Sequence, residues 1–321
     1  MGPRWTVIAG LLLLGFSSVV FGFAEQILVL DASRFIQGAA GALIWSGALT
    51  WLITSTPEER RGSIIGSALG TAVAGALLGP ALGAVAGEIG TEIVFSSVLA
   101  ITLVLAWIAA RMPETRAPET QSLREVLSTM VSRPILNAAA FVAIPSLMFG
   151  AIEVLVPLRI DELGGGHALI AVGFIGGAAL EAGLAPFSGR ISDRVGRRLP
   201  YVVGLAICTV GMVGVAAVAN IGEVFAALIV TSFGAGLCFA PALTLISDVA
   251  DASSLHQGFA AGLSNMAWAS GQVIGGVGGG VVASLTGNAA PCLAIALLLT
   301  ATVVYAFRTM SPDGQPRAVP S

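Results

Sequence analysis

Residues 169–219 read LIAVGFIGGAALEAGLAPFSGRISDRVGRRLPYVVGLAICTVGMVGVAAVA, two apolar runs joined by a short loop rich in arginine. Each run, Leu169–Phe187 and Tyr201–Ala219, has about the 20 residues that a helix needs to cross the roughly 30 Å hydrocarbon core of a bilayer. The loop between them, Gly189–Arg198, contains four arginines and one aspartate. This pattern predicts two membrane-spanning helices whose connecting loop lies in water on one side of the membrane.

The same pattern recurs along the whole chain of 321 residues. Its apolar runs lack the two-residue alternation of a membrane barrel, so the predicted fold class is an all-α membrane protein with ten transmembrane helices. The predicted helices are Trp5–Phe23, Arg34–Thr54, Ser63–Ala86, Thr91–Ala110, Ile135–Leu158, Leu169–Phe187, Tyr201–Ala219, Val224–Ile246, Phe259–Leu285 and Ala289–Phe307. We expect four helices in residues 1–111, a cytoplasmic linker in 112–134, six helices in 135–308 and a cytoplasmic tail in 309–321.

Composition excludes several classes of protein. Hydrophobic residues make up 56% of the chain and charged residues 10%, against about 25% charged residues in an ordinary soluble domain. Too few polar side chains remain to cover a water-soluble surface, which excludes a soluble enzyme, a nucleic-acid-binding module and a disordered chain. The three cysteines lie in apolar runs without a Cys-x-x-Cys pair and the two histidines are far apart, so we expect no disulfide framework, metal site or cofactor.

All 15 basic residues are arginines, and their placement predicts the orientation of the helices. Alternate loops contain 13 of them: Arg4, Arg60, Arg61, Arg111, Arg116, Arg124, Arg133, Arg190, Arg194, Arg197, Arg198, Arg308 and Arg317. The loops on the other side contain Arg34 and Arg159. Because cytoplasmic loops carry the excess of basic residues, we expect a multi-pass protein of a bacterial-type plasma membrane with both termini in the cytoplasm. A cleaved signal peptide at Trp5–Phe23 is less favoured, since this run is longer than the usual core of about 7–15 residues.

The linker contains a short amphipathic segment. Ser122-x-x-Glu125 matches a capping box, the pattern that begins many helices. The apolar residues that follow on one helical face are Leu123, Val126, Leu127, Met130 and Val131. We interpret this segment as a helix on the inner membrane surface. A regulatory or partner-binding helix is the alternative.

The arginine-rich loop carries a more specific motif. Its residues follow the order Gly-x-x-x-Asp-Arg-x-Gly-Arg-Arg, and two glycines permit a sharp turn. The motif residues are Gly189, Asp193, Arg194, Gly196, Arg197 and Arg198. This order resembles the signature loop of the major facilitator superfamily, in the copy found in the second six-helix half. The resemblance implies a helical bundle that transports small molecules.

Two further segments are similar to the same family. Arg34-x-x-Gln37-Gly38 looks like the pattern on the family's fourth helix. The second segment looks like the fifth-helix motif of antiporters, and its residues are Gly75, Gly79, Pro80 and Gly83. Taken alone, the glycine spacing indicates only a face for close helix packing.

The finer resemblance is to drug and amine exporters of the superfamily. Phe149–Leu158 resembles their seventh helix with its embedded acid, and Asn265–Gly275 resembles their eleventh. Amine transporters of vesicles have an acid where Asn265 stands, so amine specificity does not follow. The start of the chain, Met1–Trp5, looks like the end of the first signature loop. On that alignment the first two of the family's twelve helices are absent, and we expect a late start assignment or a truncated gene.

Acids inside the predicted helices are the main candidates for function. A charge at the centre of a spanning helix costs about 2.5–3.5 kcal/mol, so it needs a partner, water or a proton. Glu153 lies roughly 8 Å from the outer end of its predicted helix, and Glu181 roughly 10 Å from the inner end of the next. We expect Glu153 to bind the proton or cation and Glu181 to be the second candidate. A buried structural hydrogen bond is the alternative for both.

Other polar residues complete the predicted site. Arg34, at the outer start of its predicted helix, is a third coupling candidate, although its side chain could instead extend to the membrane surface. Possible cavity residues are Gln37, Asn137, Asn265 and Gln272. Hydrogen bonds between helices would explain these four equally well.

The sequence thus predicts a secondary active transporter rather than an enzyme. Its function would be proton-coupled efflux of small, drug-like or amphipathic compounds by alternating access. The expected partners are a small-molecule substrate, protons and the lipid bilayer, with no nucleic acid, and the expected state is a monomer. A non-transporting remnant or scaffold and a metabolite or sugar uptake transporter are the alternatives. The glycine run Gly275–Gly280 lies in an apolar segment with no preceding strand, unlike a phosphate-binding loop.

Overall fold

The computed structural model describes residues 2–57, 60–76, 86, 89–114 and 122–310, and the elements within them are all α-helices. The helices are α1 (Pro3–Phe23), α2 (Ile27–Thr54), α3 (Arg61–Ala76), α5 (Thr91–Arg111), α6 (Leu123–Met130), α7 (Arg133–Glu162), α8 (His167–Val195), α9 (Arg198–Ala217), α10 (Ile221–Ala252), α11 (Gln257–Thr286) and α12 (Ala289–Thr309). The predicted all-α class is confirmed.

Eight helices of the described part are long and apolar enough to cross a membrane. The other two predicted spans correspond to α3 and α11. The described part of α3 has 16 residues, and the remainder of the predicted span Ser63–Ala86 lies largely outside the described residues. Helix α11 has 30 residues and is not among these eight. The protein is therefore a multi-pass helical bundle, and the number of ten spans is approximate.

Several helices extend beyond their predicted ends. Helix α2 begins at Ile27 rather than Arg34, α7 ends at Glu162 rather than Leu158, and α8 ends at Val195 rather than Phe187. The predictions ended each helix where polar side chains begin. A helix satisfies its backbone hydrogen bonds internally, so it continues through polar residues into the surrounding water.

These extensions move the two acids deeper into their helices. Glu153 lies nine residues before the end of α7, which corresponds to roughly 14 Å. Glu181 lies at the middle of the 29-residue helix α8, roughly 21 Å from either end. The distances from these acids to the helix ends are therefore larger than the predicted values of roughly 8 and 10 Å.

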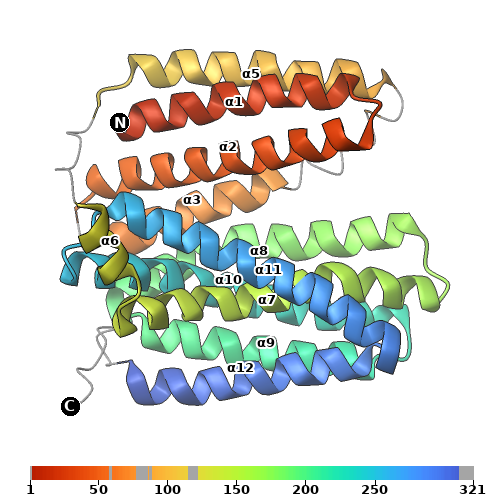
Figure 1. Cartoon of the computed structure of the whole chain (residues 1–321). Coiled ribbons are helices and arrows are strands. Elements are labelled where there is room, and N and C mark those ends of the chain that lie inside the picture. The colour runs from red at the N-terminus through yellow and green to blue at the C-terminus, as the bar shows by residue number, and fades with distance from the viewer. Residues whose placement is uncertain (1, 58–59, 77–85, 87–88, 115–121, 311–321) are drawn as a thin grey trace.

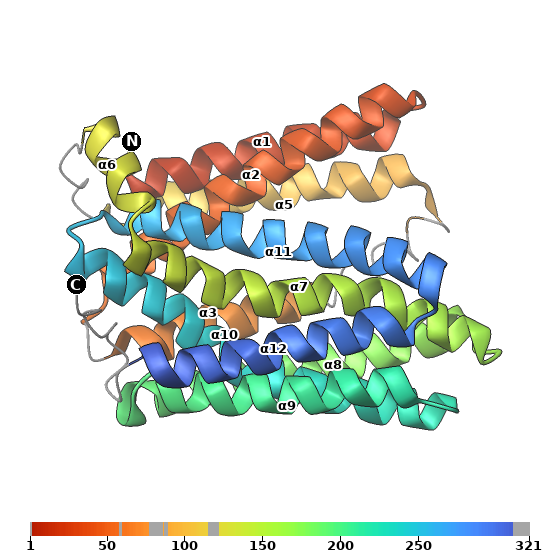
Figure 2. The same cartoon turned by 60° about the horizontal axis from the view of Figure 1, so that its bottom comes forward.

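The helices form one elongated bundle in which they run side by side (Figure 1). Helix α1 packs against α2 and α5 to form one group. Helices α7 to α12 form a second group, with α3 packed along α8. Helix α1 begins and α12 ends at the same end of the bundle, and α6 lies there too (Figures 1 and 2).

Close contacts in the second group depend on glycine. A Cβ atom on Gly275 of α11 would lie 1.8 Å from the carbonyl oxygen of Leu147 on α7. Between α9 and α10, a Cβ on Gly204 would lie 2.6 Å from the carbonyl oxygen of Gly234. Only glycine allows these backbones to approach so closely, as expected for helices that pack inside a bilayer.

Tyr201 is one of the buried polar side chains that join helices in the core of the second group. Tyr201 of α9 is fully buried, and its hydroxyl donates a hydrogen bond of 2.9 Å to the carbonyl oxygen of Phe141 on α7. The two rings also meet edge to face, with centroids 5.2 Å apart. This pair joins α9 to α7, so the packing of these helices has one fixed register.

The linker helix α6 is confirmed as a helix with a side-chain cap. The Ser122 hydroxyl accepts a hydrogen bond of 3.3 Å from the backbone N–H of Glu125. Of its apolar face, Val126 is buried, whereas Leu127 and Val131 are exposed. Its expected position on the inner membrane surface stays a prediction.

Candidate functional site

A cavity of about 420 Å³ lies among α7, α8, α10 and α11. Its volume is within the range of about 300–1,000 Å³ typical of small-molecule sites. Most of the lining is apolar, and its polar side chains are Glu153, Glu181, Thr231, Ser232 and Gln272. The described residues that line it belong to these four helices.

The cavity brings together the two acids that the sequence singled out. Glu153 of α7 is exposed, whereas Glu181 of α8 is only 7% exposed. Within the described residues, neither carboxylate has a hydrogen bond or an ion pair. The alternative role of a structural hydrogen bond is therefore not supported by the part of the chain described here.

Aromatic side chains form one wall of the cavity. Phe149 of α7 and Trp268 of α11 line it, with ring centroids 5.7 Å apart. Phe239 of α10 lies behind them, 5.3 Å from Phe149 and 4.7 Å from Trp268. The sequence did not single out these residues as a site, because an aromatic residue in a spanning helix looks like any other apolar residue.

Arg34 and Gln37 of α2 do not reach this cavity. The Arg34 guanidinium donates a hydrogen bond of 3.1 Å to the side-chain oxygen of Gln37 and lies 4.1 Å from the ring centre of Phe21. Gln37 in turn donates to the hydroxyl of Ser18 on α1 at 3.3 Å. Because α2 begins at Ile27, Arg34 lies two turns inside the helix, and the prediction that it starts the helix is wrong.

The other predicted polar residues divide between two places. Gln272 of α11 lines the cavity. Asn137 of α7 and Asn265 of α11 are half-buried and are not among its lining residues. The fifth-helix motif lies mostly outside the described residues, which exclude Gly79, Pro80 and Gly83.

Gly75, the first residue of that motif, is exposed, and a Cβ placed on it would meet no atom within 4 Å. The described part of the structure therefore gives no close packing contact at this glycine.

The arginine-rich motif differs in form from the predicted loop. Helix α8 continues to Val195, so the turn is confined to Gly196 and Arg197, and Gly196 has a φ of +84°. Gly189 is helical, and its role is close packing: a Cβ there would lie 2.2 Å from the carbonyl oxygen of Gly62 on α3. The prediction that both glycines form the turn is therefore wrong for Gly189.

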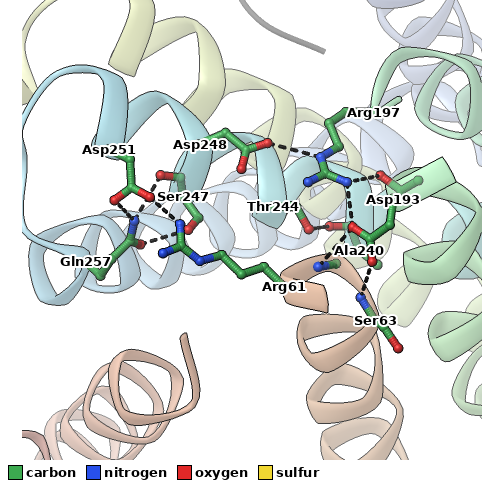
Figure 3. Close-up of polar contacts among 12 residues, drawn as sticks. Arg61, Ser63, Asp193, Arg197, Ala240, Thr244, Ser247, Asp248, Asp251 and Gln257 are labelled. Carbon is green, nitrogen blue, oxygen red and sulfur yellow. Dashed lines mark hydrogen bonds and ion pairs between the residues drawn. The ribbon is translucent and has the colours of Figure 1, made fainter. Parts of the chain in front are cut away.

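Asp193 of this motif joins α8 to α3. Its carboxylate accepts hydrogen bonds from the backbone N–H groups of Gly62, at 3.2 Å, and Ser63, at 2.8 Å. These groups belong to the first turn of α3, where free N–H groups and the helix dipole favour a negative charge. Asp193 thus acts as a cap that a different helix supplies (Figure 3).

Arg197 connects the same carboxylate to α10. It donates to Asp193 at 2.7 Å and to Asp248 at 3.0 Å (Figure 3). Burial opposes the charge of the guanidinium, but the Asp248 and Asp193 carboxylates outweigh this effect and raise the pKa of Arg197 above its ordinary value. Of the remaining motif arginines, Arg194 is exposed and Arg198 lies 3.9 Å from the ring centre of Phe307.

A second set of contacts continues this polar region. Arg61, the first residue of α3, forms an ion pair with Asp251 of α10. The side-chain NH₂ of Gln257 on α11 donates to the carbonyl oxygen of Ser247 and to the Asp251 carboxylate, and its side-chain oxygen accepts a hydrogen bond from the Ser247 hydroxyl. We call Arg61, Asp193, Arg197, Asp248, Asp251 and Gln257 the charged network. It joins α3 to α8, α10 and α11 at the end of the bundle where α1 begins and α12 ends (Figures 1 and 3).

The comparisons with known proteins agree with this architecture. The model of the Major Facilitator Superfamily matches residues 1–254 and 178–321, which together span the chain. The chain therefore belongs to the Major Facilitator Superfamily, whose members are membrane transporters of small molecules. None of the curated proteins compared with the chain matches it.

Solved structures share the fold at low sequence identity. The human organic anion transporter MFSD10 (TETRAN) superposes with a TM-score of 0.79 and 15% identity, over 95% of this chain and 77% of that chain. The E. coli fucose:proton symporter FucP has a TM-score of 0.72 and 16% identity, over 96% of this chain and 84% of that chain. A structure of FucP in the outward conformation gives a TM-score of 0.74 at 16% identity, with the same coverage. At these identities the similarity is one of fold.

Proposed function

We propose that this chain is a secondary active transporter that exports small drug-like or amphipathic compounds and is driven by protons. The observation that carries the proposal is the cavity, which holds two carboxylates without partners in the described residues within an otherwise mostly apolar lining. Ionisable residues inside a membrane are costly and usually mark a substrate or ion path. A cavity of this size and lining suits a small amphipathic molecule.

The charged network gives this proposal a conformational basis. It joins α3 to α8, α10 and α11 at one end of the bundle, and we infer that these contacts hold that end closed. We propose that this end faces the cytoplasm, because most of the arginines lie in the loops on the side of the two termini. Transport by alternating access then requires these contacts to break when the cavity opens to the cytoplasm.

Glu153 is our first candidate for the proton-binding group, and Glu181 is the second. Glu153 is the more exposed of the two carboxylates, and both line the cavity. Arg34 is not part of this proposal, since it bonds to Gln37 on its own helix and packs against Phe21 of α1. The chain is proposed to act as a monomer.

The test is proton-driven flux in vesicles that contain the purified full-length chain. Glu153→Gln keeps the size of the side chain but removes its ability to bind and release a proton. We expect it to abolish substrate movement driven by a pH gradient while the protein is still made and inserted. The matched control is Glu162→Gln, at the end of α7, where the carboxylate pairs with Arg159 outside the cavity. Unchanged flux in the Glu153 variant would exclude this residue from coupling.

The same assay separates the competing functions. The solved neighbours include a fucose:proton symporter and an organic anion transporter. The mostly apolar lining favours an amphipathic compound over a sugar, whose hydroxyl groups would need more polar partners. Accumulation of a sugar or metabolite inside vesicles with the uptake orientation would overturn export. No flux of any compound would favour the non-transporting scaffold.

A further inference from the structure

The charge of the cavity lining is one-sided. Its described lining residues include Glu153 and Glu181 but no arginine, and the chain contains no lysine. When both acids are ionised, an anionic ligand would meet two like charges, whereas a cationic ligand would meet two opposite ones. The cavity therefore favours a positively charged ligand over a negatively charged one.

Glu181 is the better placed of the two acids to hold such a charge. It is only 7% exposed, lines the cavity from the middle of α8 and has no hydrogen bond or ion pair within the described residues. A Cβ on Gly236 of α10 would lie 3.4 Å from the Cα of Glu181 and 2.9 Å from the Cβ of Leu184, so α8 and α10 pack closely at this point. Burying a carboxylate without a partner is costly unless it binds a proton or pairs with a positive charge, so a cationic ligand would stabilise its ionised form.

The remaining surface suits the apolar part of an organic cation. Phe149, Phe174 and Trp268 line the cavity, and aromatic faces attract cations as well as apolar groups. Of the polar side chains in the lining, the Thr231 hydroxyl already donates to the carbonyl oxygen of Ala227 at 2.8 Å, so it is not free to donate to a ligand.

We propose that the cavity among α7, α8, α10 and α11 binds a lipophilic organic cation, with Glu181 as its counter-charge and the Phe149–Trp268 wall against its apolar groups. This inference rests on the proposed function, since it names the substrate class of the same cavity. It assigns the two acids different roles: Glu181 determines which charge is accepted, and Glu153 exchanges the proton. Among the described residues, those that it assigns to substrate binding belong to four helices of the second group.

The test uses two probes of the same shape and opposite charge. Tetraphenylphosphonium is a lipophilic cation, and tetraphenylborate is an anion of nearly the same size. Equilibrium dialysis of each against the purified full-length chain in detergent measures binding without any gradient. We expect saturable binding of the cation and none of the anion. Equal binding of the two probes would overturn the proposal.

Variants then test the role of Glu181. Glu181→Gln should weaken binding of the cation about 30-fold, the loss expected when one partner of a buried charge pair is removed. Glu181→Asp keeps the charge and should retain most of the affinity, whereas Glu92→Gln on α5, outside the cavity, should leave it unchanged. Unaltered affinity in Glu181→Gln would overturn the role assigned to this residue. If Glu181→Gln does not fold, the proposal is still tested by cation binding to Glu181→Asp and by the comparison of the two probes on the native chain.

The result is independent of transport. Saturable, Glu181-dependent binding without proton-driven flux would support this inference and contradict the proposed transport function. Proton-driven flux of neutral or anionic compounds, together with no binding of the cation, would overturn this inference and leave the transport function intact.

Discussion

Replacing Asp193 with asparagine should loosen the contact between α3 and α8 in the charged network. The carboxylate is only 12% exposed and accepts three hydrogen bonds, two from the first turn of α3 and one from Arg197. Asparagine has nearly the same shape as aspartate, but an NH₂ group replaces one of the two carboxylate oxygens. This NH₂ group donates hydrogen bonds, and here it would face the N–H groups that now donate to the carboxylate. The substitution therefore removes the charge with little change in packing.

The size of the effect follows from these contacts. A hydrogen bond to a charged group contributes about 1.5–3 kcal/mol, and a neutral one about 0.5–1.5 kcal/mol. The variant should lose less than the full contribution of three hydrogen bonds to a charged group. Arg197 keeps its contact with Asp248, and asparagine keeps one acceptor oxygen. We expect the closed arrangement to be destabilised by roughly 2–3 kcal/mol, which corresponds to roughly 30- to 150-fold more frequent opening.

Hydrogen exchange of the Gly62 and Ser63 amides measures this opening directly, since these are the groups that Asp193 caps. Their exchange should be faster by the same roughly 30- to 150-fold factor if opening precedes exchange. Glu162→Gln, the same chemical change outside the charged network, should leave it unaltered. Equal exchange rates at both amides in the native chain and Asp193→Asn would refute the capping role of this carboxylate.

Two further substitutions test the packing of the second group. Gly275→Ala should lower the thermal midpoint of unfolding and the yield of folded protein, because the new Cβ would lie 1.8 Å from the Leu147 carbonyl oxygen. Gly278→Ala is the control: a Cβ there meets no atom within 4 Å, so this variant should melt like the native chain. Tyr201→Phe removes the hydroxyl that donates to the Phe141 carbonyl oxygen and should lower the stability by about 0.5–1.5 kcal/mol. The thermal midpoint should fall while the helical content is retained. An unchanged midpoint would show that this hydrogen bond makes no net contribution to stability.

Much of the fold could be predicted because each feature depends on one segment. The apolar runs identified the helices, and Ser122 and Glu125 identified the start of α6. The ends of α2, α7 and α8 could not be predicted from polarity. A helix ends where its backbone hydrogen bonds end, and the charged residues of α8 remain helical as far as Val195.

The candidate site was only partly predictable. Glu153 and Glu181 were identifiable because a charge in an apolar run needs an explanation. Their shared cavity depends on how α7 and α8 pack, which no local pattern encodes. The ion pair of Arg61 and Asp251 was missed, because these residues are 190 positions apart and each looks like an ordinary loop charge.

The sequence alone determined that this chain is a multi-pass helical membrane protein. It could do so because the bilayer imposes a length and a cost of charge on every segment separately. Only the tertiary structure decided that Glu153 and Glu181 share a cavity while Arg34 packs against α1, and that Asp193 caps a helix more than a hundred residues away in sequence. These relations arise from contacts over a few ångströms between helices, and hydrophobic periodicity carries no information about which helices meet.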